Sequence, residues 1–315
     1  SRAIRAEMDE QSLYMRGYAS IVLAGRISSD PEFRQQHTAD RIFVDEAQDL
    51  SPADLSVLKL LSSRGVVLAG DEQQMIYRRS SNYARAGIDV RGRTRVIRDN
   101  YRNTTEICAL SETLRQVWAD SPQGRTAGSG ASGEAGRAHR PGPAPELSFV
   151  SEQAQSAALI SRIRFFTDSL GYEPENICIL VPRTRRLREL QSELDAAGIE
   201  ATLVNSDGFT FDEPGAVRMS TLHSAKGLEF PIVCMMLFGL RGYADLDDAA
   251  TLSRNRNLVY VGITRAVDYL QVYMPESPQQ KVLVELKEAF RLYTAGRTQI
   301  ATPEENEREP GSRSR

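Results

Sequence analysis

The feature that most constrains the fold is a short hydrophobic run that ends abruptly in acidic residues, Arg-Ile-Phe-Val-Asp-Glu-Ala-Gln-Asp at positions 41–49. The β-branched and aromatic side chains at 42–44 predict a buried strand of a parallel sheet. Ligands of open α/β sheets bind beyond the carboxyl ends of the strands, so Asp45 and Glu46 would lie at a ligand-binding site. Two adjacent carboxylates there suit phosphoryl transfer, one binding Mg²⁺ and the other orienting or deprotonating a water. The same pattern also fits a strand that ends in a solvated acidic turn.

The segments after this run support a parallel sheet. Residues 50–62 carry leucines at helical spacing behind Ser51-Pro52, which predicts a helix. Residues 66–69 are apolar again and are followed by Gly-Asp-Glu-Gln-Gln at 70–74. A strand, a helix and a second strand that ends in polar residues are typical of a βαβ unit. Residues 7–24 also have helical spacing and predict a helix before this unit.

Composition limits the class of protein. A chain of 315 residues that is 41% hydrophobic allows two domains with real cores. The net charge of −3 does not indicate a nucleic-acid binder, so any such surface has to be local. The cysteines at 108, 178 and 234 form no CxxC pair, which argues against a disulfide framework or zinc site and favours a reducing, cytoplasmic location. No signal peptide and no apolar run of membrane-spanning length is found.

Residues 78–102 form a local basic stretch, with eight arginines and only two acidic residues. Tyr77, Tyr83 and Tyr101 lie within or beside it. Arginines interleaved with aromatic rings suit contacts with phosphates together with stacking on bases. The alternative is a solvated basic face with no ligand.

From residue 146 onward, predicted strands alternate with predicted helices, which indicates a second α/β lobe. The expected strands are 146–150, 177–181, 201–204, 217–220, 232–237 and 269–273, and the expected helices are 153–170, 185–197, 247–264 and 282–293. A helix is also expected at 104–119. The Gly/Ser/Ala/Pro-rich segment 120–145 predicts a flexible linker, and the charged tail 301–315 predicts disorder. We therefore expect a first lobe at 1–78 and a second lobe at 79–300.

Five segments resemble the motifs of superfamily 1 helicases of the UvrD/Rep/PcrA type and stand in that family's order. They are 45–49 (motif II), 70–78 (motif III), 99–103 (the Asn-Tyr-Arg element of motif IV), 221–230 (motif V) and 257–266 (motif VI). The resemblance covers about residues 14–273. It implies an α/β fold of the RecA-like P-loop NTPase type, with a partial first lobe, a complete second lobe, and parallel sheets flanked by helices.

The resemblance also implies which residues would hydrolyse ATP. Asp45 would bind Mg²⁺, and Glu46 would be the catalytic base. Gln74 would sense the γ-phosphate or the attacking water. Arg78 and Arg265 would be arginine fingers, a role that suits a planar and permanently charged guanidinium. With acids on one lobe and cations on the other, hydrolysis would depend on lobe closure.

Further residues are implied in binding ATP and single-stranded DNA. Tyr77 would stack on the adenine, and Gly227 and Glu229 would belong to the nucleotide site, with Glu229 contacting the ribose. The residues implied to face single-stranded DNA, with RNA left open, are Asn100, Arg102, Thr221 and His223. For each residue an ordinary structural role is the alternative, for instance a core position for Tyr77 or a helix-end ion pair for Arg265.

The P-loop pattern G-x-x-x-x-G-K-[S/T], which supplies the main grip on the β- and γ-phosphates, does not occur in the 315 residues. The chain also starts at Ser1 without a methionine. We therefore expect the C-terminal portion of a 3′→5′ ATP-dependent DNA helicase or translocase, inactive alone, whose P-loop half is supplied in cis or in trans. The alternatives are a non-catalytic nucleic-acid-binding or regulatory module that has lost its P-loop, and a split enzyme.

Overall fold

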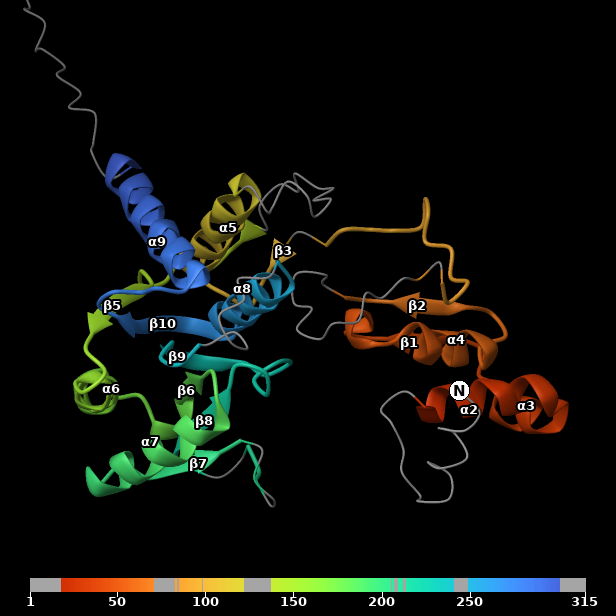
Figure 1. Ribbon diagram of the computed structural model, residues 1–315, viewed down its shortest axis with the longest axis horizontal. Coiled ribbons are helices and arrows are strands. Elements are labelled where there is room, and N and C mark those ends of the chain that lie inside the picture. Colours follow the sequence, from red (N-terminus) through yellow and green to blue (C-terminus); the bar gives the residue numbers. More distant parts are fainter. Residues whose placement is uncertain are drawn as a thin grey trace, which may run out of the picture. The chain divides into compact units, whose positions relative to one another are not determined.

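The computed structural model describes residues 18–70, 83, 85–97, 99–121, 137–204, 206, 209–211, 214–240 and 249–300. Its contacts divide the chain into two compact units, residues 1–97 and 98–315 (Figure 1). The predicted lobe boundary at residues 78 and 79 and the predicted tail at 301–315 lie outside the described residues. The predicted helix at 7–24 is described only from Tyr18 onward.

The first unit contains the predicted βαβ arrangement. Its elements are α2 (Tyr18–Ser29), α3 (Pro31–His37), β1 (Ile42–Val44), α4 (Pro52–Leu60) and β2 (Val66–Leu68). Strands β1 and β2 are parallel, with Phe43 opposite Val67. Helix α4 starts with a capping box, in which the Ser51 hydroxyl accepts from the Asp54 N–H at 3.2 Å and the Asp54 carboxylate accepts from the Ser51 N–H at 2.8 Å. This cap explains why the helix starts where the sequence predicted.

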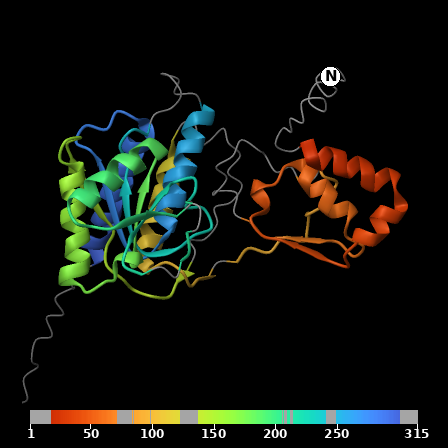
Figure 2. The same cartoon turned by 90° about the horizontal axis from the view of Figure 1, so that it is seen from below.

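Among the described residues of the first unit, the helices lie on one face of its sheet. Helices α2 and α4 pack together beside β1 and β2 (Figure 2). Phe43 is 75% exposed and its cross-strand neighbour Val67 is 44% exposed. Successive side chains of a strand point to opposite faces, so helices on one side leave alternate residues open. The expectation that β1 is a buried strand is therefore wrong for Phe43.

The second unit is built on a six-stranded sheet in the order β5-β10-β9-β6-β8-β7, in which each neighbouring pair is parallel. The strands are β5 (Glu146–Val150), β6 (Ile177–Val181), β7 (Ala201–Leu203), β8 (Val217–Thr221), β9 (Phe230–Met236) and β10 (Ala266–Pro275). The helices are α5 (Thr105–Asp120), α6 (Gln155–Arg164), α7 (Thr184–Ala196), α8 (Ala249–Thr264) and α9 (Lys281–Ile300). Helices α6 and α7 cover one face, and α5, α8 and α9 cover the other (Figures 1 and 2).

The core of the second unit explains why the sequence predicted its central strands well. Residues 177–181 are apolar throughout and fully buried, as expected for a central strand with helices on both faces. Leucines on α6 and α7, such as Leu159 and Leu190, complete one side of the core. The helix predicted at 153–170 instead starts at Gln155 and changes into a π-helical turn at Phe165–Ser169. The predicted α/β fold, with parallel sheets flanked by helices, is confirmed.

Part of the segment predicted as a flexible linker is ordered. Strand β4 (Arg137–Ala138) pairs with β3 (Asp99–Asn100), and the N–H of Gly142 donates to the Glu106 carboxylate at 2.7 Å. The side chain of Arg140 binds the carbonyl oxygen of Val267 at 2.9 Å. Glycine and proline content predicted flexibility here, but these tertiary hydrogen bonds fix residues 137–145. Residues 122–136 of the predicted linker lie outside the described part of the chain.

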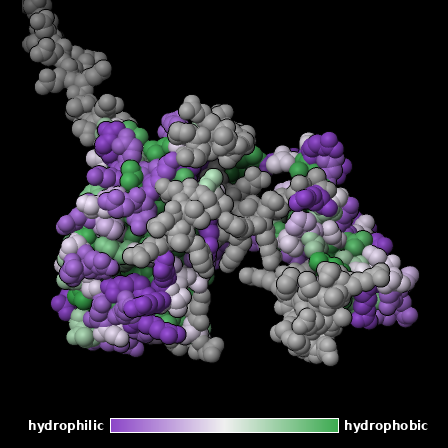
Figure 3. Space-filling view, viewed as in Figure 1, coloured by the Kyte–Doolittle hydropathy of each residue, from purple (hydrophilic) through white to green (hydrophobic). Residues whose placement is uncertain are grey.

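The described surface of the second unit is mainly polar. On the face seen in Figure 3, hydrophilic side chains dominate this unit and hydrophobic ones are scattered among them. Within the described ranges, no helix has both the length and the apolar character that a membrane span requires.

Candidate functional site

The acidic turn after β1 is the candidate site of the first unit. Asp45 is exposed, and one of its carboxylate oxygens accepts from the Glu46 N–H at 2.8 Å. Glu46 has φ of 50° and is the one non-glycine residue with positive φ among the described residues. Such a backbone conformation costs about 1–3 kcal/mol and persists only where the surroundings enforce it. The buried Gln48 helps to do so, because its side-chain amide donates to the Glu46 carboxylate.

The Asp45 carboxylate fits a Mg²⁺ site of the kind completed by a substrate. Mg²⁺ prefers oxygen ligands and is often bound by one or two carboxylates together with phosphates and waters. In the described ranges, no group of three or more His, Cys, Asp or Glu side chains is arranged to hold a metal ion.

Gln74, Tyr77 and Arg78 lie outside the described residues, so their roles stay predictions.

In the second unit, Arg265 lies between the end of α8 and the start of β10, as predicted. Its side chain is only 1% exposed. The guanidinium donates through Nε to Val261 O at 3.2 Å, through Nη1 to Leu228 O at 3.2 Å, and through Nη2 to Thr264 Oγ1 at 3.1 Å. Arg265 is thus buried and hydrogen-bonded at the amino ends of β9 and β10, and it does not project into solvent.

The last turn of α8 is pressed against the sheet just before Arg265. A Cβ atom on Gly262 would lie 2.4 Å from the Met235 sulfur and 2.7 Å from the Leu222 side chain. Such distances exclude any side chain at this position unless the neighbours move. The glycine therefore lets α8 approach β9 closely and fixes the point from which Arg265 extends.

The segment 99–103 is attached to the same place. Asn103 is 3% exposed, and its side-chain nitrogen donates to Thr264 O at 3.1 Å and to Ala266 O at 2.6 Å. The Asn100 side chain shapes the loop, because its oxygen accepts from the N–H groups of Arg102 and Asn103 at 2.9 and 3.0 Å. Asn100, predicted to contact DNA, uses its amide within this turn.

Arg102 and Glu229 were predicted to bind different ligands, and the structure pairs them. Nε of Arg102 lies 2.5 Å from Oε1 of Glu229, and the two side chains are 41% and 42% exposed. Glu229 immediately follows Leu228, whose carbonyl oxygen accepts from Arg265. Arg102, Glu229 and Arg265 therefore belong to one cluster at the amino ends of β9 and β10.

Thr221 and His223 lie at the opposite end of the sheet. Thr221 pairs with Val181, the last residue of β6, and so marks the carboxyl end of that strand. The first residue of β6, Ile177, pairs with Ile232 near the start of β9, which marks the amino end. The seven residues of β9 span about 20 Å between these ends. A strand length therefore separates Arg102 from Thr221 and His223, and their predicted contacts with DNA stay predictions. Gly227, with φ of 80°, lies in the segment that connects the two ends.

The side chains at this second end have local partners. Thr221 is 9% exposed, and its hydroxyl accepts from the Ser224 N–H at 3.1 Å. The Nε2 atom of His223 accepts from Nη2 of Arg254 at 3.0 Å. Burial lowers the pKa of His223, and the charge of Arg254 lowers it further. His223 is therefore held in its neutral form near pH 7.

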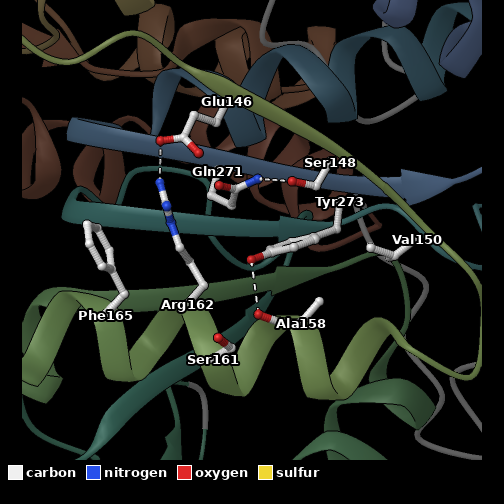
Figure 4. A pocket seen from close by; sticks show the side chains of 9 residues that line it. All are labelled: Glu146, Ser148, Val150, Ala158, Ser161, Arg162, Phe165, Gln271 and Tyr273. Atoms are coloured by element: carbon white, nitrogen blue, oxygen red, sulfur yellow. Dashed lines mark hydrogen bonds and ion pairs between the residues drawn. The ribbon is translucent and has the colours of Figure 1, made fainter.

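A separate pocket of about 370 Å³ lies between β5, β10 and α6 (Figure 4). Arg162 and Glu146 form an ion pair at 2.5 Å on one side of it, and Gln271 donates to Ser148 at 3.0 Å. The Tyr273 hydroxyl faces Ala158 O at 3.4 Å. The predicted site residues do not line this pocket. It is therefore not the site that the motifs indicate.

The structure adds residues that the sequence did not single out. Asn103 stood inside a recognised segment but had no assigned role. Arg140 lay in a segment predicted to be a linker, where nothing in the sequence marked it. Arg254 became visible only through its hydrogen bond to His223.

Comparisons with known families match two parts of the chain. Residues 18–83 match the family described as UvrD/REP helicase N-terminal domain. Residues 202–277 match the family described as UvrD-like helicase C-terminal domain.

Individual relatives match about a third of the chain. DNA helicase II of Escherichia coli K12 is 38% identical over 115 residues, covering 33% of this chain and 15% of that protein. ATP-dependent DNA helicase PcrA of Leuconostoc citreum is 39% identical over 114 residues, covering 35% of this chain and 13% of that protein. ATP-dependent DNA helicase UvrD1 of Mycobacterium leprae is 38% identical over 126 residues, covering 38% of this chain and 14% of that protein. The match thus spans only about one seventh of each relative.

A solved structure is also similar. It is the C-terminal domain of a possible DNA helicase from Lactobacillus plantarum WCFS1, with a TM-score of 0.42 and 18% identity. The match covers 61% of this chain and 96% of that one.

Proposed function

We propose, from the premise that the chain belongs to the UvrD/Rep/PcrA-like helicases, that it is part of an ATP-dependent DNA helicase or translocase. The intact protein would couple ATP hydrolysis to 3′→5′ movement on single-stranded DNA. Residues outside this sequence would supply the P-loop, in cis or in trans, because the 315 residues contain no such pattern.

One observation supports the ATPase part most strongly. Three segments far apart in the chain, residues 100–103, 228–229 and 264–266, are hydrogen-bonded together at the amino ends of β9 and β10. This brings two arginines, Arg102 and Arg265, to one place with Glu229. Guanidinium groups bind phosphates through paired N–H donors, and a nearby carboxylate suits ribose hydroxyls. We assign this cluster to the nucleotide, including Arg102, which the sequence had assigned to DNA.

The first unit would contribute the acids of the reaction. Glu46, held in an unusual backbone conformation beside Asp45, would orient or deprotonate the attacking water. Asp45 would hold Mg²⁺ together with the phosphates, and the ion would neutralise charge that develops on the transferring phosphoryl group. Arg265 would act as an arginine finger, a role that suits a planar and permanently charged guanidinium.

Single-stranded DNA would bind elsewhere. Thr221 and His223 lie at the carboxyl end of β8, about a strand length from the Arg102 cluster. Because His223 is neutral, it would offer a hydrogen bond and no charge. Phosphate contacts would come from arginines such as Arg91, Arg93 and Arg95, all of which are exposed.

We expect this chain alone to have negligible ATPase activity, because it has no counterpart of the P-loop lysine. Activity should appear when the P-loop half is supplied, and it should then vanish in Glu46→Gln. Turnover is measured with and without single-stranded DNA. DNA-stimulated turnover by the chain alone that is lost in Glu46→Gln would contradict this prediction. Binding of DNA without any turnover after the P-loop half is supplied would favour the non-catalytic module.

We expect the binding of single-stranded DNA by the chain to be weak and steeply dependent on salt, because phosphate contacts dominate on an otherwise acidic chain. Replacing Arg91, Arg93 and Arg95 by glutamine should reduce the slope of log K against log salt by roughly 2. Fluorescence anisotropy with a labelled oligonucleotide at several salt concentrations measures this slope.

The matched control removes three other exposed arginines, Arg164, Arg185 and Arg188, and so changes net charge equally. Its slope should stay near that of the wild type. Equal slopes for the wild type and the Arg91/Arg93/Arg95 variant would show that this segment does not contact phosphates.

A further inference from the structure

We infer that Asn103 is a positioning residue for Arg265, an inference that rests on the ATPase function proposed above. Asn103 is 161 residues from Thr264 and 163 from Ala266 in sequence, yet its side chain bonds the carbonyl oxygens of both. These two carbonyls belong to the residues on either side of Arg265. The amide of Asn103 therefore holds the backbone from which the Arg265 side chain extends.

Both the donors and the oxygen of the Asn103 side-chain amide have partners in the protein. A side-chain amide carries two N–H donors and one oxygen acceptor. Both donors have partners at 3.1 and 2.6 Å, and the oxygen accepts from the Asn100 side chain at 2.9 Å. With 3% of its surface exposed, the group has little water to replace a lost bond. Loss of the amide would leave two buried carbonyls without these donors, which favours movement of the Arg265 backbone.

The same contact links the two arginines of the cluster. Asn103 directly follows Arg102, so holding Asn103 also limits where Arg102 can move. Arg140 adds a second brace, since its Nη2 atom donates to Arg102 O at 3.3 Å and to Val267 O at 2.9 Å. Asn103 and Arg140, which need not touch the nucleotide, thus hold the backbone from which Arg102 and Arg265 extend.

The first test uses this chain itself. Asn103→Asp keeps the size of the side chain but replaces the donors by an oxygen that faces two carbonyl oxygens. The Phe230 N–H, which donates to Arg265 O at 3.0 Å, reports on this backbone. We expect its hydrogen exchange to become at least tenfold faster, while the amides of the central strand β6 change little. Gln279→Glu, beyond the carboxyl end of β10 and exposed, also replaces an amide by a carboxylate, lies at the opposite end of the sheet from the cluster, and serves as the control.

The second test measures ATP hydrolysis after the P-loop half is supplied. A shift of an active group by about 1 Å lowers catalysis roughly 10²-fold. We therefore expect Asn103→Asp to lower kcat by 10-fold to 10²-fold, with KM for ATP changed less than about twofold. Asn103→Ser retains one donor and adds no charge, so its kcat should lie between those of the wild type and Asn103→Asp. It is the variant to use if Asn103→Asp does not fold.

The outcomes separate this inference from the proposed function. Unchanged exchange at Phe230, or a kcat per folded molecule like that of the wild type, overturns the positioning role of Asn103 if Arg265→Ala and Glu46→Gln still lower kcat strongly. If those two variants keep wild-type turnover, the proposed function itself fails. In that case the exchange test still decides whether Asn103 holds the Arg265 backbone.

Discussion

Replacing Arg265 by alanine is expected to lower kcat for ATP hydrolysis by roughly 10²-fold or more once the P-loop half is present, while nucleotide affinity changes little. An arginine finger acts on charge that develops in the transition state, so its loss affects turnover more than ground-state binding. Arg265→Lys should restore little activity, because an ammonium group cannot reproduce the planar fork of donors. Steady-state kinetics and nucleotide titration on one preparation measure both quantities.

The burial of Arg265 makes a stability control necessary. The alanine variant also loses hydrogen bonds to Val261 O and Leu228 O, so its melting temperature should fall. Arg218 is the matched control, because it is 4% exposed and donates to two carbonyl oxygens, those of Glu175 and Phe211. Arg218→Ala should lower the melting temperature but leave kcat per folded molecule near that of the wild type.

The two variants together decide the role of Arg265. A catalytic arginine predicts a loss of kcat in Arg265→Ala far beyond that in Arg218→Ala at similar stability. If both variants lose only stability, Arg265 is a structural residue that fixes the end of α8. That result would also remove the functional consequence proposed for Asn103.

Much of the fold was predictable from the sequence because local patterns determine it. The apolar run at 177–181 forms the strand expected of it, and the helix after Ser51 starts at its predicted cap. The family was also identifiable, since its motifs are short and contiguous. Burial was less predictable, because it depends on which faces the helices cover. Phe43 has the residue type of a buried strand but lies on the open face of the first unit.

The candidate site was only partly predictable for the same reason. A motif gives the residue type and its place on an element, but not which segments meet. The pairing of Arg102 with Glu229 depends on the order of strands in the sheet and on the Asn103 contact, which joins residues more than 160 apart. Nothing within the segment 99–103 could indicate that it lies beside β9 and β10 and a strand length away from Thr221.

A different buried contact in the second unit joins α5, α8 and α9. Nε of Arg256 donates to one carboxylate oxygen of Glu285 at 2.8 Å, and Nη2 of Arg256 donates to the other. Nη2 also donates to Ser121 Oγ at 2.9 Å. Both charged side chains are about nine-tenths buried. Arg256 also lies over the ring of Trp118, 5.8 Å from its centre. These contacts involve none of the residues assigned to ATP or DNA.

Glu285→Ala is expected to lower the free energy of unfolding of the second unit by about 3–5 kcal/mol, because it leaves the Arg256 guanidinium buried without its counter-charge. Urea unfolding followed by circular dichroism measures the change. Trp118 is the single tryptophan of the chain, so its fluorescence reports on the same junction. The control is Glu288→Ala on the same helix, whose partner Arg291 is exposed, and its effect should stay below about 1 kcal/mol.

Removing both charges separates the cost of an unpaired ion from the loss of packing. Arg256→Met combined with Glu285→Leu leaves no charge to bury and keeps similar volume, so the double variant should be far more stable than Glu285→Ala. With Arg256→Met and Glu285→Leu measured singly, the cycle gives the coupling between the two sites, which should be about 3 kcal/mol. If Glu285→Ala costs less than about 1 kcal/mol, or the double variant is as unstable as the single one, then water reaches Arg256 in solution. The junction of α5, α8 and α9 would in that case be held by its apolar contacts rather than by this ion pair.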